Sequence, residues 1–293
     1  MLELLQDFRP EDELIQTSWT KQAGIGLYIR RFDRFHPFVS GNKPYKLSGW
    51  LKLHQKGQAI VSFGGVWSNH LLALAVMGKH AGIATIGIVR GERVSNPVID
   101  IITEAGMQLH FVNRAAYRLK EKSREIASII QQSGETLLVP EGGAGLPGVQ
   151  GAALMVGHQE PYDWVILPGG TGTCTAGVAQ KLSGSRATKI LAFQALKGEN
   201  ILQHEVFQRS GIDLRQFPLL VINEDFHFGG FARFPEILQQ FEKQWAHETS
   251  VFLDRVYGLK AMAGIKTKAL NGFFKPGSRL LYLHTGGFTG IKS

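Results

Sequence analysis

Cysteine is almost absent from this sequence of 293 residues. Cys174 is the only one, so no disulfide can form within the chain and no thiolate metal site can be built. This usage is typical of a protein in a reducing compartment. The first seven residues, MLELLQD, are acidic and lack the basic stretch followed by an apolar run that marks a secretory signal. We therefore expect a cytoplasmic protein without a bound metal.

Long hydrophobic runs are missing as well. The longest apolar stretch, residues 71–89, is interrupted by Lys79 and His80, so no membrane span is expected. The formal net charge is +8, but the basic residues are scattered and the densest group, residues 114–124, contains Glu121. Because no basic arm with interleaved aromatics is found, we expect a solvated surface and no nucleic-acid partner. A positive field also suits a phosphorylated cofactor or an anionic substrate.

Glycine, in contrast, is abundant, at 35 residues, and much of it lies in short clusters. Such clusters favour tight turns in which the backbone comes close to another group. The composition, 44% apolar and 19% charged, is that of an ordinary globular protein. The length allows two linked domains.

Short apolar runs alternate with segments of helical period, which is the pattern of parallel sheets with crossover helices. In the first half we predict strands at residues 59–63, 85–89, 108–112 and 136–140, and helices at residues 69–81, 97–105 and 116–132. After a glycine-rich break we predict strands at residues 164–168, 189–193, 219–223 and 279–284, and helices at residues 175–182, 235–248 and 257–271. We expect two α/β layers with a ligand cleft between them, beyond the carboxyl ends of the strands.

The loop from Gly169 to Thr175 is the clearest candidate for ligand binding. Its glycines let the backbone fold around an anion, its threonine hydroxyls add donors, and the helix that follows offers its N-terminus to a phosphate. No lysine follows the glycines, so this is not a Walker loop. Residues 143–148 fit the dinucleotide pattern G-x-G-x-x-G, but Pro147 lies inside it and no acidic residue ends the following strand. Nicotinamide binding is therefore not expected.

Six short motifs, each weak alone, occur in one order along the chain. They are residues 41–47 (GNKPYKL), 68–70 (SNH), 140–143 (PEGG), 171–177 (TGTCTAG), 254–262 (DRVYGLKAM) and 284–287 (HTGG). This ordered set resembles the 1-aminocyclopropane-1-carboxylate deaminase and D-cysteine desulfhydrase family, whose enzymes use pyridoxal 5′-phosphate (PLP) and have a tryptophan-synthase-β-like fold. The resemblance extends from about residue 28 to the C-terminus.

The resemblance implies a role for each matching residue. Lys43 would form the Schiff base with the cofactor, and Lys46 would lie close to the cofactor phosphate. Asn69 would hydrogen-bond the pyridine 3′-oxygen. Ser68 would bind the substrate carboxylate and help to transfer a proton, and Tyr257 would face the substrate.

Further site residues follow from the same resemblance. His70 is placed with Ser68 and Asn69 on the substrate side. Thr285 would set a neutral hydroxyl near the pyridine nitrogen. The cofactor phosphate would be held by Gly170, Thr171, Gly172, Thr173, Cys174 and Thr175.

The fold that the resemblance implies is that of fold-type II PLP enzymes, an α/β class with two three-layer αβα domains and mainly parallel sheets. Residues 1–46 and 156–293 would form the large PLP-binding domain, and residues 47–155 the small α/β domain. The cofactor would lie in the cleft between them. A homodimer and a small amino-acid substrate are expected on the same basis.

Elementary chemistry agrees with these roles. A Schiff-base lysine must lose its proton to attack a carbonyl, and burial lowers the pKa of lysine. Taken singly, Lys43 and Lys46 would be ordinary surface lysines, Tyr257 a packing residue and His70 a structural histidine. Cys174 alone would be a small residue filling a tight loop. Only the joint pattern favours a functional interpretation.

Two departures from the family bear on the reaction. In the cyclopropane-carboxylate deaminases a glutamate follows the active-site tyrosine and faces the pyridine nitrogen, whereas this chain has Gly258 there. Without that acid the carbanion is less delocalised, which favours elimination of a good leaving group over ring opening. Phe231 stands in a region where relatives often carry a tyrosine that can touch the substrate.

The sequence therefore predicts a PLP-dependent lyase or deaminase, which would eliminate the β-substituent of D-cysteine or a related amino acid to give a 2-oxo acid and ammonia. Deamination of 1-aminocyclopropane-1-carboxylate, β-replacement and racemisation are alternatives on the same scaffold. A binder of a phosphorylated metabolite without catalysis is a further alternative, although such a protein has no need of Lys43.

Overall fold

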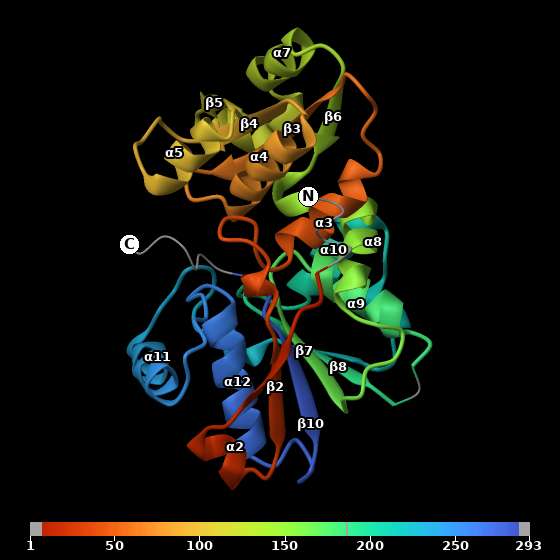
Figure 1. Cartoon of the computed structure of the whole chain (residues 1–293), viewed down its shortest axis with the longest axis vertical. Helices are drawn as coiled ribbons and strands as arrows, with labels where there is room; N and C mark the ends of the chain where they lie inside the picture. The colour runs from red at the N-terminus through yellow and green to blue at the C-terminus, as the bar shows by residue number, and fades with distance from the viewer. Residues whose placement is uncertain (1–7, 186, 287–293) are drawn as a thin grey trace.

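Two β-sheets organise the chain, as the computed structural model shows for residues 8–185 and 187–286 (Figure 1). The larger sheet has the order β1-β2-β10-β7-β8-β9 and the smaller has the order β5-β4-β3-β6. Among these strands only the β1–β2 pair is antiparallel. The strands of the larger sheet are β1 (Asp12–Ile15), β2 (Gly26–Arg30), β7 (Trp164–Gly169), β8 (Lys189–Gln194), β9 (Leu220–Asn223) and β10 (Arg279–Leu283). Those of the smaller sheet are β3 (Ala59–Gly65), β4 (Thr85–Arg90), β5 (Gln108–Val112) and β6 (Thr136–Val139).

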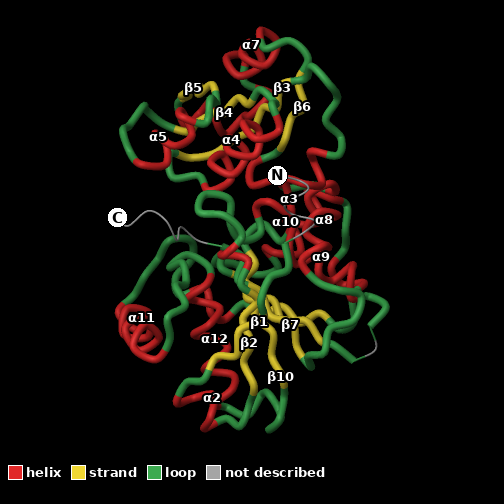
Figure 2. Tube along the Cα trace, viewed as in Figure 1, coloured by secondary structure: helices red, strands yellow, loops and turns green. Residues whose placement is uncertain are grey.

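The smaller sheet is covered by helices on both faces, which gives three layers (Figure 2). One face packs on α3 (Lys43–Leu51), α4 (Asn69–Ala81) and α5 (Pro97–Glu104), and the other on α6 (Arg114–Leu119) and α7 (Arg124–Gln132). The single helix predicted over residues 116–132 is wrong, because Lys120 has a positive φ of +53° with ψ of −133°. A non-glycine residue in that conformation cannot continue an α-helix, so the chain forms two helices there.

The larger sheet has the same three-layer construction. Side chains alternate between its faces, so that Val165 and Leu167 face one core and Ile166 faces the other. The first core is completed by α8 (Leu146–Ala152), α9 (Thr173–Leu182) and α10 (Ile201–Ser210). The second is completed by α2 (Ser18–Gln22), α11 (Glu236–Glu248) and α12 (Gly258–Leu270). Six 3₁₀ turns complete the described elements: η1 (Phe32–Arg34), η2 (Lys120–Lys122), η3 (Glu141–Gly143), η4 (Ala153–Met155), η5 (Leu214–Gln216) and η6 (Asp225–His227).

Helices α3 and α8 lie side by side where the chain passes between the two sheets (Figure 1). A Cβ atom added to Gly49 of α3 would lie 1.8 Å from the carbonyl oxygen of Pro147, and one added to Gly151 of α8 would lie 2.1 Å from that of Tyr45. Only glycine allows this backbone contact. The helix that carries Lys43 is thus held against α8.

The strand order predicts where a ligand binds. In the larger sheet the chain runs from β7 to β8 on one side, whereas β10 lies on the other side of β7. In the smaller sheet β4 and β6 flank β3 in the same way. Parallel sheets bind ligands beyond the carboxyl ends of the strands at which the order reverses. The loops after β3, β6, β7 and β10 are therefore the expected binding loops.

Within the part of the chain that the structure describes, no helix is long and apolar enough to cross a bilayer. The same residues contain no cluster of three His, Cys, Asp or Glu side chains suited to a metal ion. All strands of the smaller sheet fall within residues 47–155, while α3 crosses the first predicted boundary. The exact domain limits stay a prediction.

Candidate active site

Lys43 is the first residue of α3 and lies half-buried. Its Nζ donates a hydrogen bond of 2.6 Å to the side-chain oxygen of Asn42, the residue before it. Burial, followed by the positive charge of Lys46, lowers the pKa of Lys43 from about 10.5 to about 7. Nearby Cys174 and Asp254 act in the opposite direction. An amine with this pKa is largely neutral just above neutral pH, as a nucleophilic lysine must be.

Lys46 lies one turn further along α3 and is buried, with 5% of its surface exposed. Its Nζ donates to the backbone carbonyl of Gly142, in the loop after β6. Burial lowers the pKa of Lys46, and the proximity of Cys174 opposes this shift. The two lysines and Cys174 therefore lie close together between the two sheets.

His70 is buried beside these lysines but is anchored in the smaller sheet. The hydroxyl of Ser62 donates to the carbonyl of Val139 at 2.7 Å, so its oxygen accepts from Nε2 of His70 at 2.8 Å. Nδ1 then carries the lone pair, and it has no partner among the described residues. Burial, with the charges of Lys46 and Lys43, holds the pKa of His70 well below its usual range. His70 is therefore a neutral acceptor on the site side and a donor on the sheet side.

The loop after β7 and the first turn of α9, residues 169–175, form a concave backbone that we call the cradle. Gly172 precedes the helix with φ of +76°, and no side chain caps the amides of the first turn. A Cβ atom on Gly172 would lie 2.1 Å from Cγ2 of Val206. The hydroxyl of Thr175 is buried without a partner among the described residues, and those of Thr171 and Thr173 lie 3.3 Å apart. The uncapped amides and the unpaired hydroxyl of Thr175 at this helix N-terminus suit an anion.

Ser68 and Asn69 mark the start of α4 after β3. The Oγ of Ser68 accepts from the amide of Leu71 at 3.1 Å, which leaves its hydroxyl hydrogen free to donate. No hydrogen bond within the described residues uses the side chain of Asn69. Asn96 braces this loop: its Nδ2 donates to the carbonyl of Val66 at 3.2 Å. Its Oδ1 accepts from the first amides of α5.

Tyr257 stands directly before α12 and closes the other side of the cradle. A Cβ atom on Gly170 would lie 2.8 Å from Cε1 of Tyr257, so the ring rests on the loop backbone. Asp254 fixes the position by accepting from the amides of Val256, Tyr257 and Gly258 at 2.7 to 3.1 Å. Burial and this carboxylate raise the pKa of Tyr257 to about 12. The phenol therefore stays protonated and can donate.

Gly258 cannot be replaced by an acid without rearrangement. A Cβ atom there would lie 2.8 Å from Oδ2 of Asp254 and 3.4 Å from the hydroxyl of Tyr282. The space beside the start of α12 is thus taken by Asp254, whose pKa is raised by its burial.

Thr285 follows β10 and is buried, at 9% exposed. Its carbonyl accepts from the amide of Asn42 at 3.0 Å, and Gly41 packs on the same carbonyl. Thr285 is therefore beside the loop that presents Lys43. Gly287, the last residue of the predicted motif, lies outside the described residues.

The residues present fit PLP. A phosphate needs the amides and hydroxyls that the cradle offers, of which the buried hydroxyl of Thr175 is otherwise unpaired. A carbonyl group needs an amine of lowered pKa, which Lys43 provides. Further donors stand at two helix starts, Ser68 and Asn69 at α4 and Tyr257 at α12. Among the described residues, however, no hydrogen bond joins Ser68 or Asn69 directly to Lys43.

Four residues with clear structural tasks were given no role by the sequence interpretation: Asn42, Asn96, Asp254 and Lys260. Asn42, Asp254 and Lys260 lie inside motifs that were recognised, next to residues that were assigned. Their position within those motifs was a usable signal. Asn96 gives no such signal, because its contact with the loop after β3 exists only in the folded sheet.

Comparison with known proteins finds relatives in the family that the motifs resemble. No family model matches the chain. It is 25% identical over 290 residues to a putative 1-aminocyclopropane-1-carboxylate deaminase of Pyrococcus horikoshii, covering 92% of this chain and 87% of the relative. It is 24% identical over 311 residues to a mitochondrial bifunctional D-cysteine desulfhydrase/1-aminocyclopropane-1-carboxylate deaminase of Arabidopsis thaliana, covering 92% of this chain and 74% of the relative. The resemblance drawn from the motifs is confirmed over most of the chain.

Solved structures confirm the fold. An ACC deaminase homologue superposes with a TM-score of 0.75 at 23% identity, covering 99% of this chain and 95% of the other. A PLP-dependent aspartate racemase superposes with a TM-score of 0.66 at 12% identity, covering 95% and 90%. The chain therefore has the tryptophan-synthase-β-like α/β fold of fold-type II PLP enzymes.

Proposed function

We propose that this protein is a PLP-dependent lyase or deaminase that eliminates the β-substituent of D-cysteine or a related amino acid. The products would be a 2-oxo acid and ammonia, with sulfide released from D-cysteine. The observation that carries the proposal is the amine of Lys43, whose pKa is lowered to about 7, close to Cys174 in the first turn of α9. The names of the relatives, deaminases and a desulfhydrase, support the reaction class.

Lys43 and the α9 cradle would hold the cofactor between the sheets. PLP supplies an electron sink for the bond that breaks at the substrate Cα. The amides of the first turn of α9 and the hydroxyls of Thr171, Thr173 and Thr175 would bind its phosphate. Lys46 adds a positive charge nearby, although its ammonium also donates to Gly142.

The substrate side is assigned to groups that can donate. Ser68 keeps a free hydroxyl hydrogen and lies with Asn69 at the start of α4, where an anion is favoured. These residues would orient the substrate carboxylate. Nζ of Lys43 is neutral for much of the time near pH 7 and can accept the proton from the substrate Cα. Tyr257 remains protonated and donates toward the substrate.

Elimination is favoured over ring opening by the start of α12. Gly258 brings no carboxylate, and the space its side chain would enter is taken by Asp254. Thr285 offers only a neutral hydroxyl beside the Lys43 loop. The leaving group must therefore depart readily, as a thiol does.

We also propose that the protein is a cytoplasmic homodimer. Its large domain would comprise residues 1–46 and 156–293, and its small domain residues 47–155. These proposals rest on the family resemblance, and the free, buried Cys174 is consistent with a reducing compartment. Size-exclusion chromatography with light scattering tests the dimer. A mass equal to one chain would contradict it.

The deciding experiment compares Lys43→Ala with wild type and with Lys52→Ala, a control at the exposed end of the same helix. We expect wild type and the control to show a visible absorption band with PLP and to release pyruvate and ammonia from D-cysteine. Lys43→Ala should lose both. Turnover by Lys43→Ala with bound PLP would refute the mechanism. Wild-type protein that stays colourless with added PLP would leave only a non-catalytic binder.

A further inference from the structure

Lys260 is a buried lysine that the proposed chemistry does not use. It lies on α12, three residues after Tyr257, with 1% of its surface exposed. Among the described residues no carboxylate forms an ion pair with it. Its Nζ donates instead to two backbone carbonyls, those of His227 at 2.9 Å and Gly230 at 2.6 Å. A buried ammonium is costly unless such acceptors replace water, so these two bonds explain why the charge is tolerated.

The two carbonyls belong to a strained turn, residues 227–232. Four of its six residues have left-handed backbones: Phe228, Gly229, Gly230 and Ala232, with φ of +49°, +90°, +103° and +56°. Two of these are not glycine, and such residues rarely adopt this conformation without support. Within the turn the Gly230 amide donates to the His227 carbonyl at 3.0 Å. The ammonium of Lys260 therefore supplies the bonds that tie the turn to α12.

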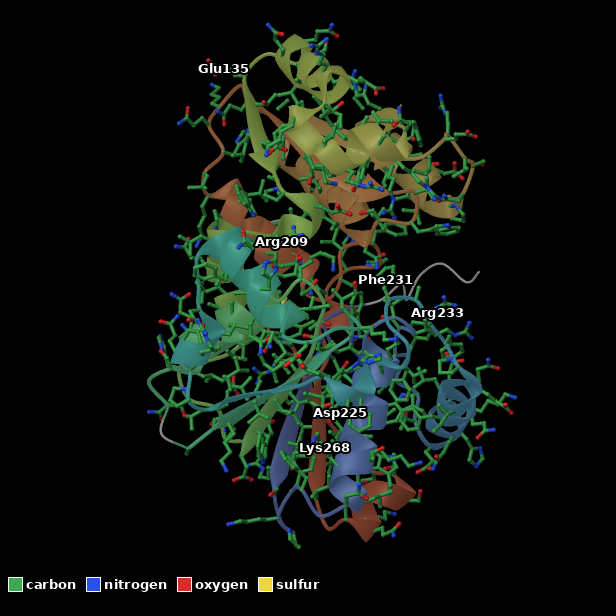
Figure 3. All side chains as sticks on the ribbon, turned by 180° about the vertical axis from the view of Figure 1, so that it is seen from behind. Glu135, Arg209, Asp225, Phe231, Arg233 and Lys268 are labelled. Carbon is green, nitrogen blue, oxygen red and sulfur yellow. The ribbon has the colours of Figure 1, made fainter. Side chains whose placement is uncertain are left out.

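The turn places one aromatic side chain over the site. The ring of Phe231 is 58% exposed and meets the ring of Tyr257 at 6.1 Å, edge to face. Tyr257 in turn rests on the backbone of Gly170 in the anion cradle. Figure 3 shows Phe231 near the level at which the chain passes between the two sheets, whereas Lys268 lies further along α12, away from that level.

We propose that Lys260 is a positioning residue that holds the 227–232 turn on α12 and thereby seats Phe231 against Tyr257 at the substrate side of the site. The role of Tyr257 in this inference rests on the proposed function. The inference that Lys260 holds the turn does not depend on the proposed function, because it is argued from the two carbonyl contacts. Since Lys260 acts through Phe231 and Tyr257, its loss should affect substrate binding more than cofactor binding.

Lys260→Met tests whether the ammonium holds the turn, because methionine is similar in length but cannot donate to the carbonyls of His227 and Gly230. Lys268→Met, on the same helix, is the matched control. We expect hydrogen exchange at the amides of Gly229 and Gly230 to accelerate about tenfold or more in Lys260→Met, since bonds to a charged donor are strong. The control should leave it unchanged. Unchanged exchange in Lys260→Met would overturn the proposal whether or not the protein is an enzyme.

Kinetics test the effect on the site. In Lys260→Met we expect KM for D-cysteine, or whichever amino acid wild type turns over, to rise about five- to tenfold, with kcat and the PLP titration within twofold of wild type. A kcat loss with KM unchanged would contradict a positioning role. Wild type without a PLP band would instead defeat the proposed function, and hydrogen exchange would still decide the hold on the turn.

A double-mutant cycle with Phe231→Leu separates positioning from general destabilisation. Phe231 is exposed, so this variant should fold even if Lys260→Met does not. We expect Phe231→Leu to raise KM by a similar factor, and the double variant to add little to either single one. Phe231→Leu with a wild-type KM would overturn the link to the site. Effects on KM that multiply in the double variant would also overturn it.

Discussion

The left-handed glycine at the start of α9 allows the cradle to be tested quantitatively. Gly172→Ala adds one methyl group to a backbone with φ of +76°. Gly211→Ala, at the end of α10, adds the same group to a backbone with φ of +73°. The two sites differ in their surroundings. The new Cβ would lie 2.1 Å from Cγ2 of Val206 at Gly172, and would meet nothing within 4 Å at Gly211.

The pair separates two costs. The left-handed backbone should lower the free energy of unfolding by about 1 to 2 kcal/mol in both variants. Overpacking should lower it by about 1 to 3 kcal/mol more in Gly172→Ala alone. If the loop shifts to relieve the contact, the amides of the cradle move with it, so the affinity for PLP should also fall.

Urea denaturation of both variants, with the slope of the transition held common, measures the difference in the free energy of unfolding. Titration with PLP, followed by visible absorbance, measures cofactor binding. Gly211→Ala should bind PLP like wild type. Equal destabilisation in the two variants would refute the clash at Val206, and unchanged PLP affinity in a destabilised Gly172→Ala would refute the assignment of the cradle.

Three more predictions concern other parts of the site. Because the folded protein holds the pKa of Lys43 near 7, below its unfolded value, the rate of PLP uptake should rise with pH through about 7 and then level off. In Lys46→Met that midpoint should move upward, since a neighbouring positive charge is lost; an unmoved midpoint in stopped-flow absorbance would contradict the coupling. Asn96→Asp keeps the oxygen that accepts from α5 but replaces the donor to the Val66 carbonyl by a carboxylate oxygen, which repels that carbonyl. KM should therefore rise several-fold, with thermal stability nearly unchanged. Asn113→Asp, which caps α6 in the same way, is its control, and an equal KM in both variants would argue against the brace. Gly258→Glu should lower the unfolding midpoint and yield no 2-oxo acid from 1-aminocyclopropane-1-carboxylate, because the buried carboxylate before α12 occupies the space; robust turnover would show that the space opens.

Much of the fold could be predicted from the spacing of the apolar residues and from the capping residues and glycines at which helices begin and end. The helix at residues 69–81 has the predicted limits, since Ser68 caps its start and Gly82 ends it with φ of +65°. The strand at residues 108–112 also has its predicted limits. Strands β1 and β2 were not predicted. They are short, and β2 is recognisable mainly through its pairing with β10, which is some 250 residues away. The local pattern of apolar residues does not indicate such a distant pairing.

In the site, too, features carried by local motifs could be predicted, whereas contacts made by the folded sheets could not. Lys43, Lys46, Cys174 and Thr285 lie near one another, as their motifs suggested. The hydrogen bond that Nε2 of His70 donates to Ser62 could not be foreseen, because its direction is set by the bond from Ser62 to Val139, and that bond depends on β6 lying beside β3. The roles of the individual site residues in chemistry remain predictions until the variants above are measured.

The sheet order also determines when each half of the protein can fold during synthesis. The four strands of the smaller sheet are contiguous, from residue 59 to residue 139, so they can pair as soon as that stretch leaves the ribosome. The larger sheet is different, because β10 sits between β2 and β7 and is made last. The N-terminal strands must therefore wait, with one edge unpaired, until residues 279–283 emerge. We expect the nascent chain to depend on the early-folding half for solubility, and truncation before β10 to leave the Lys43 helix attached to an unfinished sheet.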